Sequence, residues 1–179
     1  MADTALVIID IQNDYFPGGA MELEGAQAAG AKAGAALEKF RKEGIPVFHV
    51  RHLSTRPGAT FFLPGTPGAE IHASVQPREG ELVVEKNFPN SFRGTALQNH
   101  LDKHKIKNLV VAGMMTHMCV DATVRAAADL GYKVTLLADA CATRNQSFGG
   151  EVIAARQVHG AFLAALNGFY AKVVPTHEL

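Results

Sequence analysis

The sequence predicts an α/β fold in which helices cover both faces of a doubly wound, mainly parallel sheet of six strands, giving three layers. Short apolar runs without polar alternation are typical of strands that are buried on both faces of a parallel sheet. Helical patterns lie between most of these runs, which favours alternating strands and helices. The chain has 179 residues, 47% of them hydrophobic, which is enough for one core. We therefore expect a single domain over residues 1–179.

Six apolar runs are the candidate strands. Most of their residues are valine, isoleucine, leucine or alanine, and their short, continuous form separates them from amphipathic helices. They cover residues 5–9, 46–50, 82–84, 109–112, 134–138 and 173–174.

Four stretches with apolar residues at helical spacing are the candidate helices. In the first of them, Ala26, Ala33 and Phe40 fall on one stripe, and Gly44 followed by Pro46 ends the helix. The four candidate helices cover residues 25–42, 95–103, 119–130 and 150–167.

One long irregular stretch, residues 52–80, is rich in proline and glycine and contains the pair Phe61 and Phe62. A loop of this length inside a compact domain is commonly functional. We expect it to form either a lid over the site or a contact between subunits.

The composition argues against several classes of protein. Seventeen basic and 17 acidic residues cancel, so the chain lacks the basic footprint of a nucleic-acid binder. No stretch approaches the roughly 18 apolar residues that a membrane span needs, and residues 1–10 lack the basic region of a secretory signal. Cys119 and Cys141 could form one disulfide at most, so we expect a reduced, cytoplasmic protein that binds neither nucleic acid nor membrane.

Polar residues that follow the strands are the candidate site residues. Ligands of open α/β sheets bind at the carboxyl ends of the strands, where the winding reverses, and the first and fourth strands flank that point. Asp10 directly follows the first strand, and Cys119 lies where the loop after the fourth strand turns into a helix. A helix N-terminus favours a thiolate, and a nearby lysine such as Lys86 would favour it further.

Each of these residues also has a plainer interpretation. Asp10 could cap a turn, Cys119 could be a buried and inert side chain, and Lys86 could be a solvated surface residue.

Together, the three segments resemble the isochorismatase-like superfamily of cysteine hydrolases, which is related to nicotinamidases and N-carbamoylsarcosine amidohydrolases. The family's D-x-Q-x-D-F pattern stands here at residues 10–15 with Tyr15 as its aromatic residue. The lysine segment appears in variant form at residues 86–92, and the nucleophile segment at residues 113–120. The resemblance runs from about Thr4 to Leu179 and implies the Rossmann-like fold described above.

The resemblance implies a catalytic triad. Cys119 would attack a carbonyl carbon and form a thioester, Asp10 would take up and return the proton, and Lys86 would hold the charge balance. It also implies a cis peptide bond between Met114 and Met115, with the backbone N–H groups of Met115 and Cys119 forming an oxyanion hole.

Aromatic and sulfur-containing residues near these segments suggest an apolar pocket for a small carbonyl compound. They are Phe16, Phe61, Phe62, Phe88, Phe92, Met114 and Met115. His117 and Arg51 could contact a polar end of that compound. The candidate substrate-binding residues are Phe16, Phe88, Phe92, Met114 and His117.

We expect no metal and no other cofactor. The metal site of nicotinamidases in this superfamily uses a D-x-H element after the second strand, and that element is missing around His49. The expected partner is a small-molecule substrate, and the expected assembly is a homo-oligomer, either a dimer or a tetramer.

The expected reaction is hydrolysis of an amide-type C–N bond, and three alternatives remain. Cys119 could be a redox-sensing thiol that pairs with Cys141, or the chain could be a non-catalytic binding module. A vinyl-ether hydrolase of the isochorismatase type is the third, although such enzymes in the family lack the cysteine nucleophile.

Overall fold

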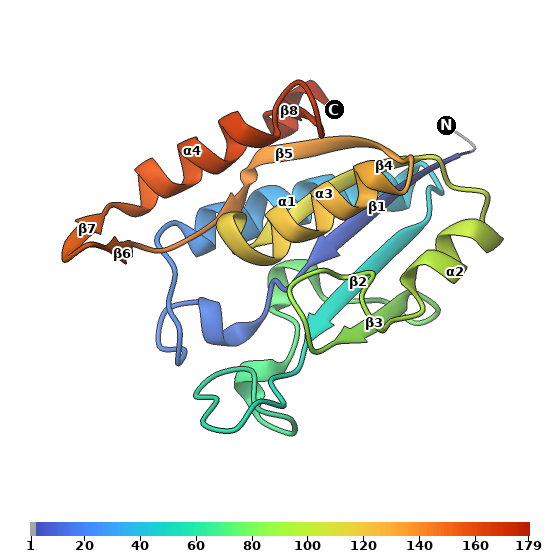
Figure 1. Ribbon diagram of the computed structural model, residues 1–179. Helices are drawn as coiled ribbons and strands as arrows, with labels where there is room; N and C mark the ends of the chain where they lie inside the picture. Colours follow the sequence, from blue (N-terminus) through green and yellow to red (C-terminus); the bar gives the residue numbers. More distant parts are fainter. Residues whose placement is uncertain (1–2) are drawn as a thin grey trace.

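The computed structural model describes residues 3–179 and contains a six-stranded parallel sheet with helices on both faces (Figure 1). The strand order is β3-β2-β1-β4-β5-β8, so β1 and β4 are neighbours at the centre, where the winding reverses. The fold class is as the sequence predicts. The strands are β1 (Thr4–Ile9), β2 (Val47–His52), β3 (Leu82–Lys86), β4 (Asn108–Met114), β5 (Lys133–Ala142) and β8 (Lys172–Val174).

Burial explains why these apolar runs form the sheet. Residues 5–9 of β1 are all buried, since parallel neighbours flank the strand on both edges and helices cover both of its faces. Alternate residues of β1 therefore enter different cores: Leu6 and Ile8 pack against α1, while Val7 packs with the helices on the other face.

The helices divide between these two cores. Helix α1 (Ala26–Lys42) covers one face with its alanine-rich stripe and Phe40. Helices α2 (Leu97–Lys103), α3 (Asp121–Asp129) and α4 (Ala155–Leu166) contribute buried residues to the core on the other face.

All four predicted helices start later than the sequence pattern suggests, and for two of them another element accounts for the delay. The helix predicted over 150–167 begins at Ala155, because a hairpin of β6 (Gln146–Phe148) and β7 (Glu151–Ile153) precedes it. Gly149 and Gly150 both have positive φ, at 60° and 84°, and form the hairpin's turn. The helix predicted over 119–130 begins at Asp121, after a separate turn that holds Cys119.

The long loop of residues 53–81 (Figure 1, below β2) is held against the end of β1. The Gln12 side-chain oxygen accepts a hydrogen bond from the His52 N–H at 2.8 Å, and its amide donates to the Ala69 carbonyl at 2.8 Å. The Asp14 carboxylate accepts from the Phe62 N–H at 2.6 Å. A Cβ atom at Gly68 would lie 2.1 Å from that carboxylate, so only glycine fits there. The two polar residues that follow Asp10 in its motif therefore fix this loop.

Within residues 3–179, no helix combines the length and the apolar character that crossing a membrane requires.

Candidate active site

Asp10 lies immediately after β1, with its side chain fully buried. Its φ of 52° is left-handed, a conformation that few residues other than glycine adopt and that is found disproportionately at functional sites. The backbone N–H of Asp10 donates to the Val50 carbonyl of β2 at 3.0 Å, which anchors this conformation at the sheet's edge. One carboxylate oxygen, Oδ1, has no hydrogen-bond partner in the described part of the chain.

Lys86 is the last residue of β3 and is 1% exposed. Its ammonium lies 2.7 Å from Asp10 Oδ2, in an ion pair whose two side chains are both completely buried. The same nitrogen lies 3.0 Å from His52 Nδ1 and donates to the sulfur of Cys119 at 3.3 Å. The structure thus places three residues from distant parts of the chain in direct contact, and Lys86 is at their centre.

Cys119 lies in a π-helical turn, Thr116–Val120, that connects β4 to α3. Such turns occur frequently at functional sites. Thr116 attaches this turn to β5 and α4. Its hydroxyl donates to the carbonyl of Ala142 in β5 and lies 2.9 Å from Nδ1 of His159 in α4.

The end of β4 approaches β1 closely at Gly113. A Cβ atom there would lie 2.3 Å from the Ile9 carbonyl oxygen, and φ is 154°. A glycine therefore allows the β4 segment before the cysteine turn to lie against the residue that precedes Asp10. The peptide bond between Met114 and Met115 is cis.

The electrostatics of the site favour a neutral thiol beside an ion pair. Burial, together with the Asp10 charge, raises the pKa of Cys119 above its ordinary value, although Lys86 opposes this rise. Burial alone would lower the pKa of Lys86, but Asp10 and Cys119 outweigh it, and the net shift is upward. Burial and the Lys86 charge lower the pKa of His52 to about 4, so its imidazole is neutral at pH 7 and accepts the lysine's hydrogen bond.

The same residues are the strongest candidate for a metal site in the described chain. Donor atoms of Asp10, His52 and Cys119 all lie within 4.8 Å of one another, and this is a set that zinc can use. However, the Lys86 ammonium contacts all three of these side chains. The lysine already supplies the positive charge that a metal ion would bring, so the set does not suit a metal ion while Lys86 is protonated.

A cavity of about 300 Å³ opens beside Cys119. The predicted site residues Phe88, Met115 and Cys119 line it. The remaining lining residues are Tyr15, Met21, His52, Ser54, Arg56, Phe61, Phe62, Asn87, Pro89, Met118 and Arg144.

Four of the predicted substrate-binding residues, Phe16, Phe92, Met114 and His117, are not among the residues that line this cavity. The Phe16 ring stacks on His72, with 3.4 Å between centroids, and Phe92 stacks on Tyr132. Met114 is fully buried in the core, and Nδ1 of His117 lies 2.6 Å from the Thr143 hydroxyl. Neighbouring residues of an extended or turning chain point in different directions, so Tyr15 lines the cavity in place of Phe16, and Met115 lines it while Met114 does not.

Arg51 is also outside the cavity lining. Its guanidinium pairs with Glu70 at 2.9 Å and with Glu85. His52, the next residue along β2, lines the cavity without having been predicted as a site residue, although its position at the end of the strand was a usable signal. Arg56 and Arg144 also line it, and they lie in irregular segments that have no periodic pattern.

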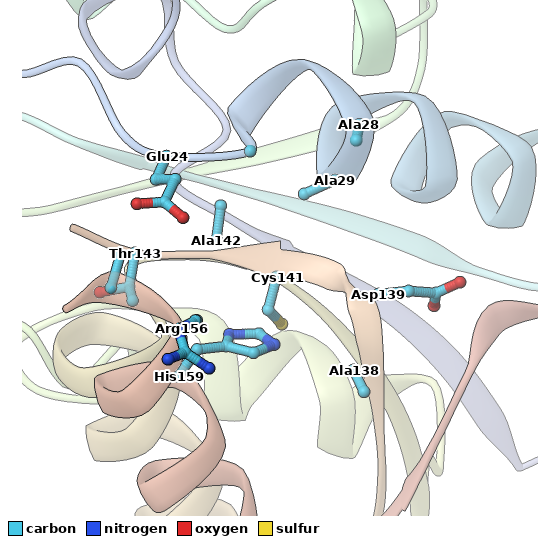
Figure 2. Close-up of a pocket in the computed structure, with 12 residues that line it drawn as sticks. Glu24, Ala28, Ala29, Ala138, Asp139, Cys141, Ala142, Thr143, Arg156 and His159 are labelled. Atoms are coloured by element: carbon cyan, nitrogen blue, oxygen red, sulfur yellow. The ribbon is translucent and has the colours of Figure 1, made fainter. Parts of the chain in front are cut away.

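The second cysteine faces a different cavity. Cys141 is an internal residue of β5 and lines a cavity of about 260 Å³ together with Arg156 and His159 (Figure 2). Cys119 is not among the residues lining that cavity, and Cys141 is not among those lining the first. This separation disfavours a redox pair of the two thiols.

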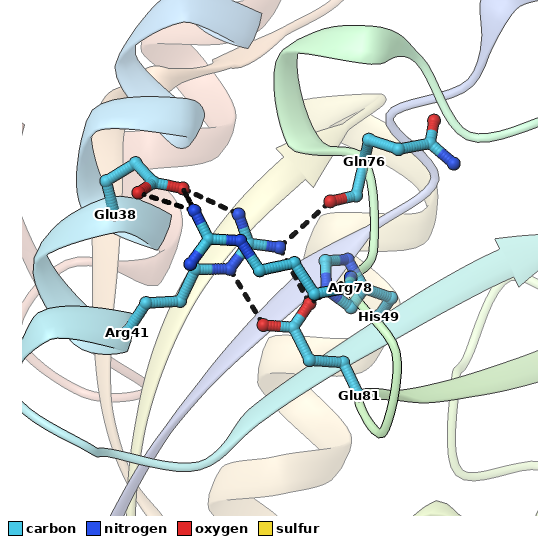
Figure 3. A network of polar contacts seen from close by, with 6 residues as sticks. All are labelled: Glu38, Arg41, His49, Gln76, Arg78 and Glu81. Carbon is cyan, nitrogen blue, oxygen red and sulfur yellow. Dashed lines mark hydrogen bonds and ion pairs between the residues drawn. The ribbon is translucent and has the colours of Figure 1, made fainter.

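His49 belongs to a polar network that is separate from the cavity (Figure 3). Its Nε2 lies 3.0 Å from Glu81, and Glu81 pairs with Arg41 of α1 at 2.7 Å. Hydrogen bonds from Arg41 are the main cause that lowers the pKa of Glu81 to about 2. Burial is the main cause that lowers the pKa of His49. The network connects α1 to the segment before β3, so His49 has a structural role.

Comparisons with known proteins agree with the geometry. Residues 4–175 match the family model for the Isochorismatase domain. The chain is 50% identical over 173 residues to an uncharacterized isochorismatase family protein, YddQ, of Bacillus subtilis, covering 97% of this chain and 96% of that protein. A crystal structure of a putative isochorismatase hydrolase from Oleispira antarctica superimposes with a TM-score of 0.95 at 50% identity, covering 99% and 95% of the two chains.

Other matched relatives are named nicotinamidase and ureidoacrylate amidohydrolase. Nicotinamidase 3 of Arabidopsis thaliana is 30% identical over 190 residues, which cover 98% of this chain and 86% of that protein.

Proposed function

The chain belongs to the isochorismatase family of hydrolases, and from that premise we propose that it hydrolyses an amide-type C–N bond of a small carbonyl compound through a thioester on Cys119. The observation that supports this most strongly is the contact of Lys86 with both Asp10 and Cys119, at 2.7 and 3.3 Å, beside a cavity of small-molecule size.

Because the pKa of Cys119 is raised, its attack on the substrate requires a base that removes the thiol proton. A thiol that stays protonated at neutral pH requires a base in the same step, and Asp10 offers an oxygen without a hydrogen-bond partner. In this proposal the thiol proton moves to Asp10 while the sulfur attacks the carbonyl carbon. The carbonyl oxygen becomes an oxyanion, and the N–H groups of Met115 and Cys119 stabilise it.

The later steps reuse the same carboxyl group. Protonated Asp10 gives its proton to the leaving nitrogen, the C–N bond breaks, and the thioester remains. A water molecule then gives a proton to Asp10 while the water oxygen attacks the carbonyl carbon of the thioester. When the C–S bond breaks, that proton returns to the sulfur and the acid leaves. Lys86 remains protonated throughout and balances the charge on Asp10 and on the reacting sulfur.

Ammonia release from a panel of small primary amides tests the proposal. We expect turnover of at least some of these amides by the purified protein. Turnover of vinyl ethers with no release of ammonia from any amide would contradict it.

We also propose that the working form is a dimer or a tetramer. The β6–β7 hairpin projects away from the sheet (Figure 1) and exposes 83% of Phe148 and 70% of Val152. Analytical ultracentrifugation that finds only a monomer at micromolar concentration would contradict this.

A further inference from the structure

The cavity beside Cys119 has two positive charges in its walls. Arg56, from the loop of residues 53–81, and Arg144, which follows β5, both line it. Among residues 3–179, no aspartate or glutamate lines the same cavity. Beneath it, the charges of Asp10 and Lys86 cancel, and His52 is neutral at pH 7. The cavity is therefore positive overall, and a cleft lined by charges of one sign attracts ligands of the other sign.

Neither arginine has a protein partner for its guanidinium in the described chain. Outside the cavity, Arg41, Arg51, Arg78 and Arg125 each pair with a carboxylate, whereas Arg93 and Arg156 have no carboxylate partner among the described residues. The guanidinium groups of Arg56 and Arg144 are therefore available to bind a ligand in the cavity.

We propose that the substrate carries a carboxylate, which Arg56 and Arg144 bind while the carbonyl group to be attacked lies at Cys119. This inference rests on the proposed amide hydrolysis and specifies its substrate class. Guanidinium groups bind carboxylates through paired, charge-assisted hydrogen bonds. Phe61, Phe62 and Phe88 supply apolar surface for the hydrocarbon between the two ends.

The size of the cavity limits the length of that hydrocarbon. A volume of about 300 Å³ is at the lower end of the range for small-molecule sites, which favours a compact compound. The charge of Arg144 also acts on Tyr15, another residue of the cavity lining. Burial is the main cause that raises the pKa of Tyr15, and Arg144 opposes this rise.

A pair of matched amides provides the first test. Succinamate and succinamide have nearly the same shape, but only succinamate carries a carboxylate. We expect kcat/KM for succinamate to exceed that for succinamide by at least about tenfold, the value of one charge-assisted contact. In Arg56→Gln and Arg144→Gln the ratio of the two kcat/KM values should fall toward one. Arg78→Gln removes the same charge outside the cavity and should keep the wild-type ratio. A wild-type ratio of one or less would overturn the proposal.

A second test does not require turnover. Iodoacetate and iodoacetamide differ by the same exchange of carboxylate for amide, and both alkylate thiols. We divide the alkylation rate with iodoacetate by the rate with iodoacetamide, at Cys119 and for free cysteine. The ratio at Cys119 should be at least about tenfold larger than the ratio for free cysteine in the wild type, and it should fall in both arginine variants. An equal ratio in wild type and variants would overturn the carboxylate site. If no amide is hydrolysed but the alkylation ratio behaves as expected, the proposed reaction fails while the anion preference stands.

Protection of Cys119 separates a carboxylate site from a general anion site. Succinate should slow alkylation by iodoacetamide in the wild type more than the same concentration of inorganic phosphate does. Equal protection by the two anions would overturn the assignment to carboxylates.

Discussion

The Lys86 ammonium and the Asp10 carboxylate form an ion pair at 2.7 Å with both side chains fully buried, and the same ammonium also donates to Cys119. A buried pair of this kind is costly to break, by about 3–5 kcal/mol, because removing one partner leaves the other charge uncompensated. The pair therefore links the end of β3 to the residue that follows β1, past the intervening strand β2, and it sets the charge around the nucleophile. Most of the following predictions depend on it.

Cys119→Ala should abolish amide turnover, by at least about 1000-fold, and keep the fold, because the change removes the nucleophile but little volume. Steady-state ammonia release and circular dichroism would measure the two effects. Cys141→Ala is the matched control, since Cys141 lines the other cavity, and it should keep its activity. Equal losses in the two variants would contradict the role of Cys119.

Asp10→Asn and Lys86→Met should move the titration of Cys119 in opposite directions. Asp10 raises the pKa of the thiol and Lys86 lowers it, so the asparagine variant should ionise Cys119 at lower pH than the wild type and the methionine variant at higher pH. The pH dependence of alkylation by iodoacetamide measures this shift. Amide turnover should nevertheless fall strongly in both variants. Shifts of the same sign would show that the ion pair does not control the thiol.

His52 should make the protein less stable as the pH falls from 6.5 to about 4. Its folded-state pKa is about 4, against an ordinary 6.5, because burial and Lys86 disfavour the charged ring. In this window the unfolded chain binds a proton that the folded chain does not, so the free energy of unfolding falls as the pH falls.

Urea denaturation at pH 7 and at pH 4.5 measures that change. In His52→Gln the difference in unfolding free energy between the two pH values should be smaller than in the wild type, while His49, His117 and His159 still contribute their share. The same difference in both proteins would show that His52 titrates normally.

Two glycine-to-alanine substitutions should have opposite effects. Gly113→Ala forces a Cβ atom to within 2.3 Å of the Ile9 carbonyl, so we expect a loss of at least about 1–3 kcal/mol and of turnover, because the cysteine turn moves. Gly160→Ala, in helix α4 with open space around it, should stabilise the protein by about 0.5–1 kcal/mol. Thermal unfolding compares the two, and a neutral Gly113→Ala would contradict the close approach of β4 to β1.

The sequence was sufficient for the elements whose hydrophobic pattern is strong. Runs such as residues 5–9 and 109–112 are strands with the expected neighbours, and Asp10, Lys86 and Cys119 lie in contact as the motifs imply. The π-helical turn before α3 and the β6–β7 hairpin were missed, because their residues continue the helical pattern of the segment that follows and only backbone pairing distinguishes them.

The residues that line the cavity were harder to predict than the contact of Asp10, Lys86 and Cys119. Tyr15 and Phe16 are adjacent aromatic residues, and no sequence pattern shows which ring enters the cavity; the contacts of Asp14 and the stacking of Phe16 on His72 decide it. Arg56 and Arg144 reach the site from segments that tertiary contacts alone bring together.

The measurement that tests the account most directly is the mass of Cys119 during turnover. An amide substrate, quenched with acid in the steady state and analysed by peptide mass spectrometry, should leave its acyl group on the peptide that contains Cys119, and hydroxylamine should remove that group. The peptide that contains Cys141 should remain unmodified. Steady amide turnover with no acyl group on Cys119, together with full activity of Cys119→Ala, would contradict the thioester mechanism.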